Sequence, residues 1–330
     1  GVFEGLRVIP TKDVALPARL KELSVDVVRA YGGAWPADMA CAYRYGAVPV
    51  VVSLHDRRPE TAHDMLRFAD VVLGVSEDTC ALARKRGVLP KRVWLRPNGV
   101  DTEMMRPLAD APLPLELRTT SCARYVLHVG RLSPEKNLDT LIDALAFLPA
   151  DTGLVVIGPG DNAPYRARAE KAGLASRVVF TGGVSNGNLP AYYNAAAVVC
   201  QPSHTEAMSN VVLEAMACGR PLVVSAAAAK GVGISDGVEA CVLADLSVPA
   251  LVSALRSVLE DGPLCQALGS RARAAVMRYE VKDMARQEAA QYARILEMKA
   301  AGVFRRGMLF QWSVLMARLW GRVQRKICHE

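Results

Sequence analysis

The stretch PSHTEAMSNVVLEAMACGRP, residues 202–221, determines the fold that the sequence predicts. The apolar run 195–200 just before it is short enough to be a buried strand. The run after Asn210 predicts a short helix, with Asn210 as N-cap because its side chain can accept a hydrogen bond from an unpaired helix N–H. Gly219 followed by Pro221 predicts the end of that helix. The stretch therefore predicts a strand, a loop and a short helix.

Two carboxylates flank the anion site that this arrangement predicts. Glu206 is expected in the loop at the carboxyl end of the strand, and Glu214 one turn into the helix. The free N–H groups and the helix dipole favour an anion in the adjoining crevice. Carboxylates beside an anion can accept hydrogen bonds from hydroxyl groups or stabilise a developing positive charge. A sugar nucleotide has all three matching features: a diphosphate, hydroxyl groups and an oxocarbenium-like transition state. For Glu214 alone, an acid in the first turn of a surface helix is the simpler explanation.

The pattern Pro-Ser-x-x-Glu followed by Leu-Glu-Ala-Met-Ala-x-Gly-x-Pro resembles the signature of glycosyltransferase family 4, with seven residues between Glu206 and Glu214. The resemblance covers residues 25–296 and is far more specific than a lone Gly-rich motif. It implies an α/β protein of GT-B type, with two Rossmann-like parallel-sheet domains and a cleft between them. It also implies sugar transfer from a nucleotide diphosphate to an acceptor hydroxyl with retention of configuration, in polysaccharide or glycolipid synthesis.

The first half of the chain alternates predicted strands and helices, which favours a parallel sheet with ligands bound beyond the carboxyl ends of its strands. The strand 48–54 ends at His55, which the resemblance places against the donor sugar near the reacting carbon; the alternative is a solvated loop histidine. Asp56 either orients His55 or binds the acceptor, and both interpretations are compatible with the sequence. The expected strands are 5–9, 26–31, 48–54, 71–75 and 93–95, and the expected helices 17–23, 37–45, 61–68 and 76–86.

The second half contains a predicted phosphate clamp in residues 125–138, which form a strand, a loop and the start of a helix. Gly130 lets the backbone approach a ligand closely. Arg131 and Lys136 place two cations at a helix N-terminus, where the dipole disfavours bare basic residues. A diphosphate between them removes this conflict, and the resemblance implies a donor-phosphate clamp here.

The resemblance assigns further donor contacts to two glycine loops and to the signature itself. The backbone of 182–184 is expected to meet the base, and Glu214 to hold the ribose hydroxyls. Glu206 and His55 are the catalytic candidates. The implied donor-binding residues are Gly130, Arg131, Lys136, Gly158, Gly182, Val184, Met208, Ser209, Asn210 and Glu214.

The expected donor is a UDP-, GDP- or ADP-sugar, and the acceptor a glycan or a lipid-linked sugar. No cofactor and no metal are expected, because Arg131, Lys136 and the loop N–H groups can stabilise the leaving diphosphate. Two rival functions share these features: an epimerase of GT-B fold that acts on a sugar nucleotide without an acceptor, and a nucleotide-binding fragment without turnover.

Two departures from the family pattern favour impaired activity. Ala207 stands where the family commonly has Gly, and if this position needs a positive φ the loop is strained by about 1 kcal/mol. The strand, Gly-rich loop and long helix that normally open the first domain have no counterpart here, so that domain is expected to be incomplete. Residues 226–236 also depart from the family's usual Gly-rich loop with an acid soon after it: the chain has the small-residue run 226–229 and then Gly231 and Gly233.

Composition indicates a globular protein, with 51% hydrophobic and 22% charged residues. The eight cysteines have no regular spacing and are expected as small buried side chains in a reducing compartment, which suggests a cytoplasmic protein. The net charge is +7, of which six basic residues and Glu330 place +5 in residues 301–330. The rest of the chain is then only +2, which argues against nucleic acid as a partner.

The basic tail alternates arginines with apolar and aromatic side chains. It can bind an anionic membrane surface at the inner face of the membrane, or its apolar side can pack on the first domain. The expected division is 1–106 for a partial first domain, 107–123 for a linker, 124–280 for the nucleotide-sugar domain, 281–299 for a crossover helix and 300–330 for the tail. The tail residues concerned are Phe304, Leu309, Phe310, Trp312, Leu315, Leu319, Trp320 and Val323, with Arg305, Arg306, Arg318, Arg322, Arg325 and Lys326.

Overall fold

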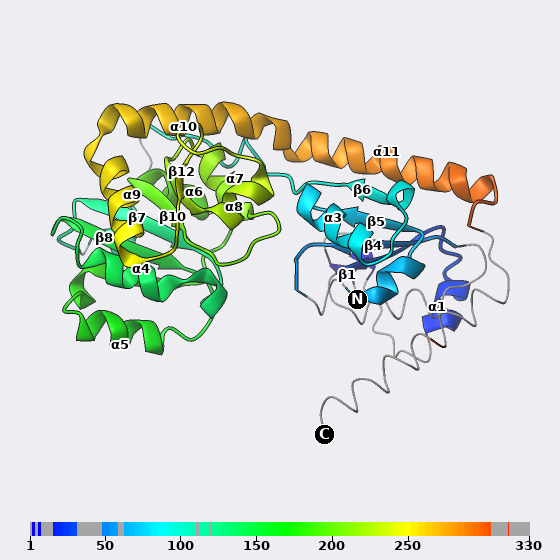
Figure 1. Cartoon of the computed structure of the whole chain (residues 1–330), viewed down its shortest axis with the longest axis horizontal. Helices are drawn as coiled ribbons and strands as arrows, with labels where there is room; N and C mark the ends of the chain where they lie inside the picture. The colour runs from blue at the N-terminus through cyan, green and yellow to red at the C-terminus, as the bar shows by residue number, and fades with distance from the viewer. Residues whose placement is uncertain are drawn as a thin grey trace, which may run out of the picture. The chain divides into compact units, whose positions relative to one another are not determined.

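The computed structural model divides into two compact units, drawn in Figure 1. Unit 1 comprises residues 1–96 and 287–330, and unit 2 comprises residues 97–286. The structure describes residues 2–3, 6–7, 16–31, 48–58, 63–109, 112–118, 120–304 and 316.

Unit 2 is built on a parallel six-stranded sheet in the order β12-β11-β10-β7-β8-β9. The strands β8 and β9 follow β7 on one side of the sheet. The next strand, β10, lies on the other side of β7, and β11 and β12 continue in that direction. The strand order therefore reverses between β7 and β10. The strands are β7 (Arg124–Val129), β8 (Thr152–Ile157), β9 (Val178–Gly182), β10 (Val198–Gln201), β11 (Leu222–Ser225) and β12 (Cys241–Leu243).

Helices cover this sheet, whose strands are mainly apolar. All six residues of β8 are buried, as expected for a parallel strand covered on both faces. Residues of α4 and α9, among them Leu141 and Leu255, pack in one cluster with Val126 and Val156 of the sheet. The helices are α4 (Leu138–Leu145), α5 (Ala163–Lys171), α6 (Leu189–Ala195), α7 (Asn210–Ala217), α8 (Ala226–Val232), α9 (Val248–Glu260) and α10 (Gly262–Val276), with short 3-10 turns at Leu115–Leu117, Pro134–Lys136, Ala175–Arg177 and Met277–Tyr279.

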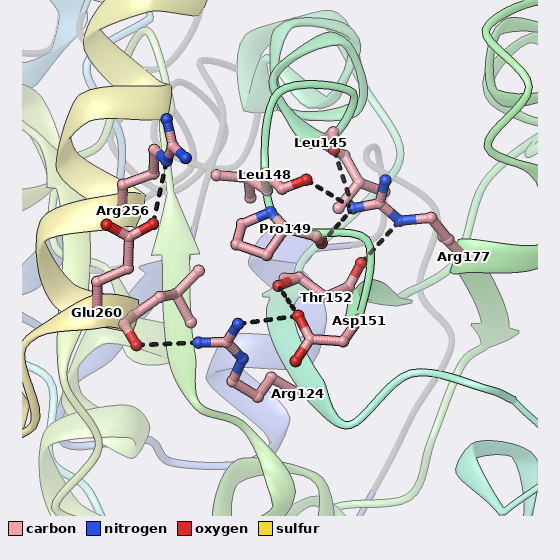
Figure 2. A network of polar contacts seen from close by, with 10 residues as sticks. Arg124, Leu145, Leu148, Pro149, Asp151, Thr152, Arg177, Arg256 and Glu260 are labelled. Carbon is pink, nitrogen blue, oxygen red and sulfur yellow. Dashed lines mark hydrogen bonds and ion pairs between the residues drawn. The ribbon is translucent and has the colours of Figure 1, made fainter.

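Arg177 closes the end of α4 (Figure 2). Its Nε donates to the Thr152 carbonyl at 2.9 Å, and its Nη2 donates to the carbonyls of Leu145 at 3.1 Å and Pro149 at 2.9 Å. The last carbonyls of a helix have no partner within it and carry partial negative charge. The guanidinium therefore adds a donor to the last carbonyl of α4, that of Leu145, and binds the connection to β8 at Pro149 and Thr152.

Unit 1 holds a parallel four-stranded sheet in the order β3-β4-β5-β6 and a separate antiparallel pair, β1-β2. Asp70 Oδ2 accepts a hydrogen bond from the Val50 N–H at 2.9 Å and so fixes the start of β4. The elements are β1 (Val2–Phe3), β2 (Leu6–Arg7), α1 (Leu16–Glu22), β3 (Val28–Tyr31), β4 (Val50–Leu54), η2 (Asp64–Phe68), β5 (Val71–Gly74), α3 (Glu77–Lys85), η3 (Pro90–Arg92), β6 (Val93–Leu95) and α11 (Val281–Ala300), whose residues from 287 onward belong to this unit.

The two faces of the unit 1 sheet bury different partners, because alternate residues of a strand point to opposite faces. Val50 and Val52 pack in a cluster with α3 and η2, whereas Val51 packs with Ile295 of α11 and with Phe304. The beginning of α3 is fixed by a capping box between Ser76 and Thr79. Phe304 is 2% exposed, so this residue of the predicted tail belongs to the core of unit 1.

The predicted α/β class with two parallel sheets is confirmed. Within the predicted strand 5–9, residues 6–7 form β2 and the other three lie outside the described residues. Within the predicted helix 61–68, Asp64–Phe68 form a 3-10 helix. The predicted helix 37–45 lies outside the described residues. Residues 226–232, for which no helix was predicted, form α8, because Ser225 caps a run of four alanines.

In the sequence, the first boundary between the two compact units lies between Arg96 and Pro97, ten residues before the predicted limit at 106. Residues 100–105 belong to unit 2 because they bond to its other parts: the Val100 N–H donates to the Tyr279 carbonyl at 2.9 Å, and Arg273 Nη1 donates to the Met105 carbonyl at 3.2 Å. The functional division predicted from the sequence stays a prediction.

Candidate functional site

Two loops of unit 2 meet where its strand order reverses. The first follows β7 and the second follows β10, and parallel α/β sheets bind ligands beyond the carboxyl ends of the strands at such a point. The His204 N–H donates to the Glu135 carbonyl at 2.8 Å, and Lys136 Nζ lies 2.6 Å from Glu206 Oε1. The predicted clamp and the signature stretch are thus parts of one site.

The Lys136–Glu206 ion pair is largely shielded from water. The two side chains are only 17% and 12% exposed, and the Ser203 hydroxyl donates to the same oxygen, Glu206 Oε1, at 3.0 Å. A pair shielded from water in this way interacts more strongly than a surface pair, and removal of one partner leaves an uncompensated charge. The site therefore holds a cation and a carboxylate in contact.

Three of the predicted glycines lie at the ends of neighbouring strands. The Gly130 N–H donates to the Ile157 carbonyl, and the Gly158 N–H donates to the Gly182 carbonyl, each at 2.8 Å. A Cβ on Gly158 would lie 1.8 Å from the Gly130 carbonyl oxygen, and Gly130 has a φ of +155°. Gly158 is therefore required by the packing of the chain on itself, whatever it contributes to a ligand.

The loop before α7 is held by the N-cap of the helix and by contacts with Asn98. Ser209, and not Asn210 as predicted, is the N-cap: its side chain accepts from the Val212 N–H, and Asn210 is the first helical residue. The reason is that the extended backbone required at the cap falls one residue earlier. Asn210 Oδ1 instead accepts from Asn98 Nδ2 at 2.8 Å, and the Asn98 N–H contacts the sulfur of Met208 at 3.2 Å.

Glu214 lies one turn into α7, as predicted, and is half-buried. Its Oε2 accepts a hydrogen bond from the Tyr193 hydroxyl at 2.6 Å. Burial raises the pKa of Glu214, while the Tyr193 hydrogen bond acts in the opposite direction. Burial and the adjacent carboxylate also raise the pKa of Tyr193 well above its usual value, so the phenol keeps its proton and is the donor.

Four buried polar atoms around the two loops have no hydrogen-bond partner among the residues that the structure describes. His128 is fully buried in β7; its Nδ1 lies 3.1 Å from the Cys200 carbonyl, so this nitrogen carries the proton and Nε2 is an acceptor. Burial is the main cause that lowers the pKa of His128 to about 4, so the ring is neutral. The other three atoms are Gln201 Oε1, Ser133 Oγ and Asn137 Nδ2. Buried polar atoms of this kind are normally satisfied by water or a ligand.

The remaining predicted donor residues are more open. Arg131 is 65% exposed and lies 3.5 Å from Glu135, and it does not take part in the Lys136–Glu206 pair. Val184 is half-buried and follows Gly182, which ends β9. The structure thus brings Lys136 and Glu206 together and leaves Arg131 at the rim.

Ala207 does not strain the loop through a positive φ, which corrects the expectation above. Ser24 and Asn137 are the non-glycine residues with positive φ within the described part of the chain. Ala207 is instead buried, at 6% exposure, against α8. A Cβ on Gly231 would lie 2.5 Å from the Ala207 carbonyl oxygen. The small residues of α8 therefore let this helix approach the signature loop.

His55 follows β4 in unit 1, at the carboxyl end of that sheet, and is exposed. Burial by its neighbours, and then the charges of Arg29 and Arg96, lower its pKa, whereas Asp56 raises it. Asp56 Oδ2 accepts from Arg58 Nη2 at 2.8 Å. The lowered pKa favours the neutral form of the imidazole.

Several polar residues of the site were not predicted from the sequence. Tyr193 looks like an ordinary core aromatic, and its partner Glu214 is 21 residues away in the chain. His128 and Gln201 offered a signal, because each is a polar residue in an otherwise apolar strand. The dipeptide Asn98-Gly99 predicts a turn, and only the structure shows that the Asn98 side chain bonds to Asn210.

Within the described residues, no group of three or more His, Cys, Asp and Glu side chains is arranged to hold a metal ion. No helix among those same residues combines the length and the apolar character needed to cross a membrane.

Two family models match the chain. The model for glycosyl transferases group 1 matches residues 118–275, and the model for glycosyltransferase family 4 matches residues 2–104. The D-inositol 3-phosphate glycosyltransferase of Xylanimonas cellulosilytica is 30% identical over 224 residues, which cover 63% of this chain and 53% of the relative. The chain spans about half the length of the curated relatives it matches.

Solved structures show the same fold. HepE from Anabaena, in complex with UDP-glucose, matches with a TM-score of 0.75 and 23% identity over 86% of this chain and 82% of that one. WaaG, a glycosyltransferase involved in lipopolysaccharide biosynthesis, matches with a TM-score of 0.67 and 21% identity over 83% and 80%. The fold is therefore that of the GT-B glycosyltransferases. The chain belongs to glycosyltransferase family 4, of the group 1 type.

Proposed function

We propose that this chain carries the donor site of a retaining glycosyltransferase, which moves a sugar from a nucleotide diphosphate to an acceptor hydroxyl. The observation that supports this most is the Lys136–Glu206 pair, 2.6 Å apart where the strand order reverses. A donor in the act of transfer has a negative diphosphate beside a sugar that becomes positive. A cation and a carboxylate in contact are complementary to that charge distribution.

In the proposed reaction, the bond between the anomeric carbon and the diphosphate oxygen breaks, and its electron pair goes to the oxygen. Lys136 and the N–H groups at the start of α7 stabilise the charge on the diphosphate. Glu206 stabilises the positive charge on the sugar, and the acceptor oxygen bonds to the same face of the anomeric carbon. The proton of the acceptor hydroxyl passes to the departing diphosphate oxygen, which lies on that face. Arg131, exposed at the rim, adds a second cation for the diphosphate.

The nucleoside is held by Glu214 and by the loop that follows β9. The carboxylate of Glu214, oriented by Tyr193, accepts hydrogen bonds from the ribose hydroxyls. The backbone at Gly182 and Val184 faces the base. Of the UDP-, GDP- and ADP-sugars expected, UDP-sugars are favoured, because HepE, of the same fold, was solved with UDP-glucose.

His55 is proposed to contact the donor sugar from unit 1. Its neutral imidazole can accept a hydrogen bond from a sugar hydroxyl at one nitrogen and donate at the other. The acceptor is proposed to be a glycan or a lipid-linked sugar in polysaccharide or glycolipid synthesis, at the cytoplasmic side of a membrane. The curated relatives act, by name, on D-inositol 3-phosphate, which makes a phosphorylated polyol a further acceptor to include in tests.

A two-stage experiment tests the proposal against the epimerase and the non-catalytic alternatives. Thermal shift with UDP-, GDP- and ADP-sugars identifies the donor class. NMR of the reaction products with and without acceptor then identifies the reaction. The proposal predicts stabilisation by one class, and sugar transfer with retained anomeric configuration only when an acceptor is present. Epimerised sugar nucleotide without acceptor, inverted product, or stabilisation without any turnover would contradict it.

A further inference from the structure

Three side chains of unit 1 are stacked at the carboxyl end of its sheet. The Arg29 guanidinium carbon lies 4.2 Å from the centre of the Tyr31 ring, and the rings of Tyr31 and His55 are stacked with centroids 5.8 Å apart and planes 22° from parallel. Both distances are within the range of favourable cation–π and aromatic contacts. Alternation along β3 places Arg29 and Tyr31 on the same face, and Tyr31 pairs with Ser53, two residues before His55.

Arg29 is itself immobilised by two further elements. Its Nε donates to Ser53 Oγ on β4 at 2.8 Å, and its Nη1 donates to the Tyr292 hydroxyl on α11 at 3.1 Å. Nη1 also forms an ion pair with Glu288, one turn before Tyr292 on α11. The side chains of Arg29 and Glu288 are only 13% and 15% exposed. A long side chain with this many partners has one orientation.

Glu288 also binds the second arginine of this region. Arg96, which follows β6, donates from Nε to Glu288 Oε2 at 2.9 Å. One carboxylate thus stands between two guanidinium groups. The charged groups that act on His55 are Arg29 on β3, Arg96 after β6 and Asp56 in its own loop.

We propose that Arg29 and Tyr31 are positioning residues for His55: Tyr31 fixes the plane of the imidazole, and Arg29, anchored by Glu288 and Tyr292 of α11, fixes Tyr31. This inference rests on the proposed role of His55 at the donor sugar. Tyr31 is 57% exposed, so without Arg29 on its ring it is free to change rotamer. Next to burial, the charge of Arg29 lowers the pKa of His55 and so favours the neutral imidazole, the form that can both accept and donate a hydrogen bond.

The test compares four variants of the full chain. Tyr31→Leu removes the ring, Tyr31→Phe keeps the ring and removes the hydroxyl, and Arg29→Met removes the charge while Glu288 keeps Arg96 as its partner. Arg294→Met is the matched control, because Arg294 also lies on α11 over an aromatic ring, that of Trp94 at 4.8 Å, but is not part of the stack. Each variant is checked for its melting temperature.

The first measurement is the NMR titration of His55, assigned with the variant His55→Gln. Arg29→Met should raise the pKa of His55, because a cation that disfavours protonation is gone. Tyr31→Leu should change the chemical shift of the imidazole, because the ring current of its stacking partner is lost, whereas Arg294→Met should leave both unchanged. This readout does not depend on turnover, so it remains valid if the proposed function is wrong.

The second measurement is the rate of sugar transfer. Tyr31→Leu and Arg29→Met should lower kcat by about tenfold to a hundredfold, the range caused by misplacement of a catalytic group, with donor KM nearly unchanged. Tyr31→Phe should recover most of the rate. An unchanged His55 titration in Arg29→Met, or a Phe variant as slow as the Leu variant, would overturn the positioning role.

Discussion

Glu206 has one oxygen, Oε1, that takes both the Lys136 ammonium and the Ser203 hydroxyl. The residue type and its place in the signature could be predicted from the sequence, but the ion pair could not. Lys136 is 70 residues away in the chain, and only the order of the strands brings the two loops together. At this scale the sequence identifies the functional groups, and the fold determines which of them touch.

Glu206→Gln should separate turnover from donor binding. The amide keeps an acceptor for Ser203 and Lys136 and removes the negative charge. Because the contact strengthens as the sugar becomes positive, kcat should fall by about a hundredfold or more while donor KM changes less than about threefold. Steady-state kinetics at saturating acceptor measure both constants. A rise in donor KM that accounts for the whole loss of kcat/KM would show that Glu206 serves in binding alone.

Glu214→Gln should change the pH dependence of stability. Burial raises the pKa of Glu214 in the folded protein, so the folded state holds a proton that the unfolded state has already lost, and stability falls as pH rises from the ordinary carboxyl range through the raised pKa. The amide accepts the same Tyr193 hydrogen bond without that penalty. The melting temperature of the variant relative to the native protein should therefore increase with pH over this window, as measured by calorimetry. A difference independent of pH would mean that the carboxyl group titrates alike in both states.

At the scale of elements, the helices and strands with clear periodicity and caps were predicted well, and the weakly marked ones were not. The strands β5 and β6 and the helix α3, with its Ser76 cap, are close to the predicted ranges 71–75, 93–95 and 76–86. The helix α8 was not predicted because its run of alanines has no hydrophobic periodicity. Its structural role depends on its contact with the loop that contains Ala207, which the sequence does not show. Small residues there leave space for the Ala207 carbonyl.

Gly231→Ala should therefore disturb the signature loop. The added Cβ would lie 2.5 Å from the Ala207 carbonyl oxygen and 3.2 Å from the Met208 Cα, so the loop or the helix has to move. Overpacking of this kind costs about 1–3 kcal/mol. We expect a lower melting temperature and weaker donor binding in thermal-shift titrations. Gly262→Ala is the matched control, because a Cβ there meets nothing within 4 Å. Equal donor affinity in both variants would show that α8 does not support the site.

At the scale of the whole molecule, residues 97–286 carry all the proposed nucleotide contacts, whereas His55 and its stack belong to the other compact unit. The sequence predicted two parallel-sheet domains from alternating strands and helices. It could not predict the limit at Arg96, because residues 100–105 join unit 2 through contacts with Tyr279 and Arg273, far along the chain. The proposal that follows is that donor affinity depends on unit 2 and turnover on both units.

The basic tail provides a prediction at the same scale. Residues 305–330 lie outside the described part of the chain except for Met316, but Phe304 is buried with Val51 and Ile295. A chain that ends at Phe304 should keep its melting temperature and lose affinity for anionic liposomes, because each basic residue near such a surface contributes about 1 kcal/mol. Liposome sedimentation measures this. Undiminished binding would remove the membrane proposal, and a large loss of stability would favour packing of the tail on unit 1.

The central claim, that a nucleotide diphosphate binds at the Lys136–Glu206 pair, is tested most directly by calorimetric titration of UDP, GDP and ADP. Lys136→Met removes the cation, and the double variant Lys136→Met with Glu206→Gln removes it without leaving an unpaired carboxylate. One nucleotide should bind the native protein with a stoichiometry of one, and both variants should bind it about tenfold or more weakly, because a charge-assisted contact to phosphate is lost. A double variant that is folded and binds the nucleotide as tightly as the native protein would contradict the account.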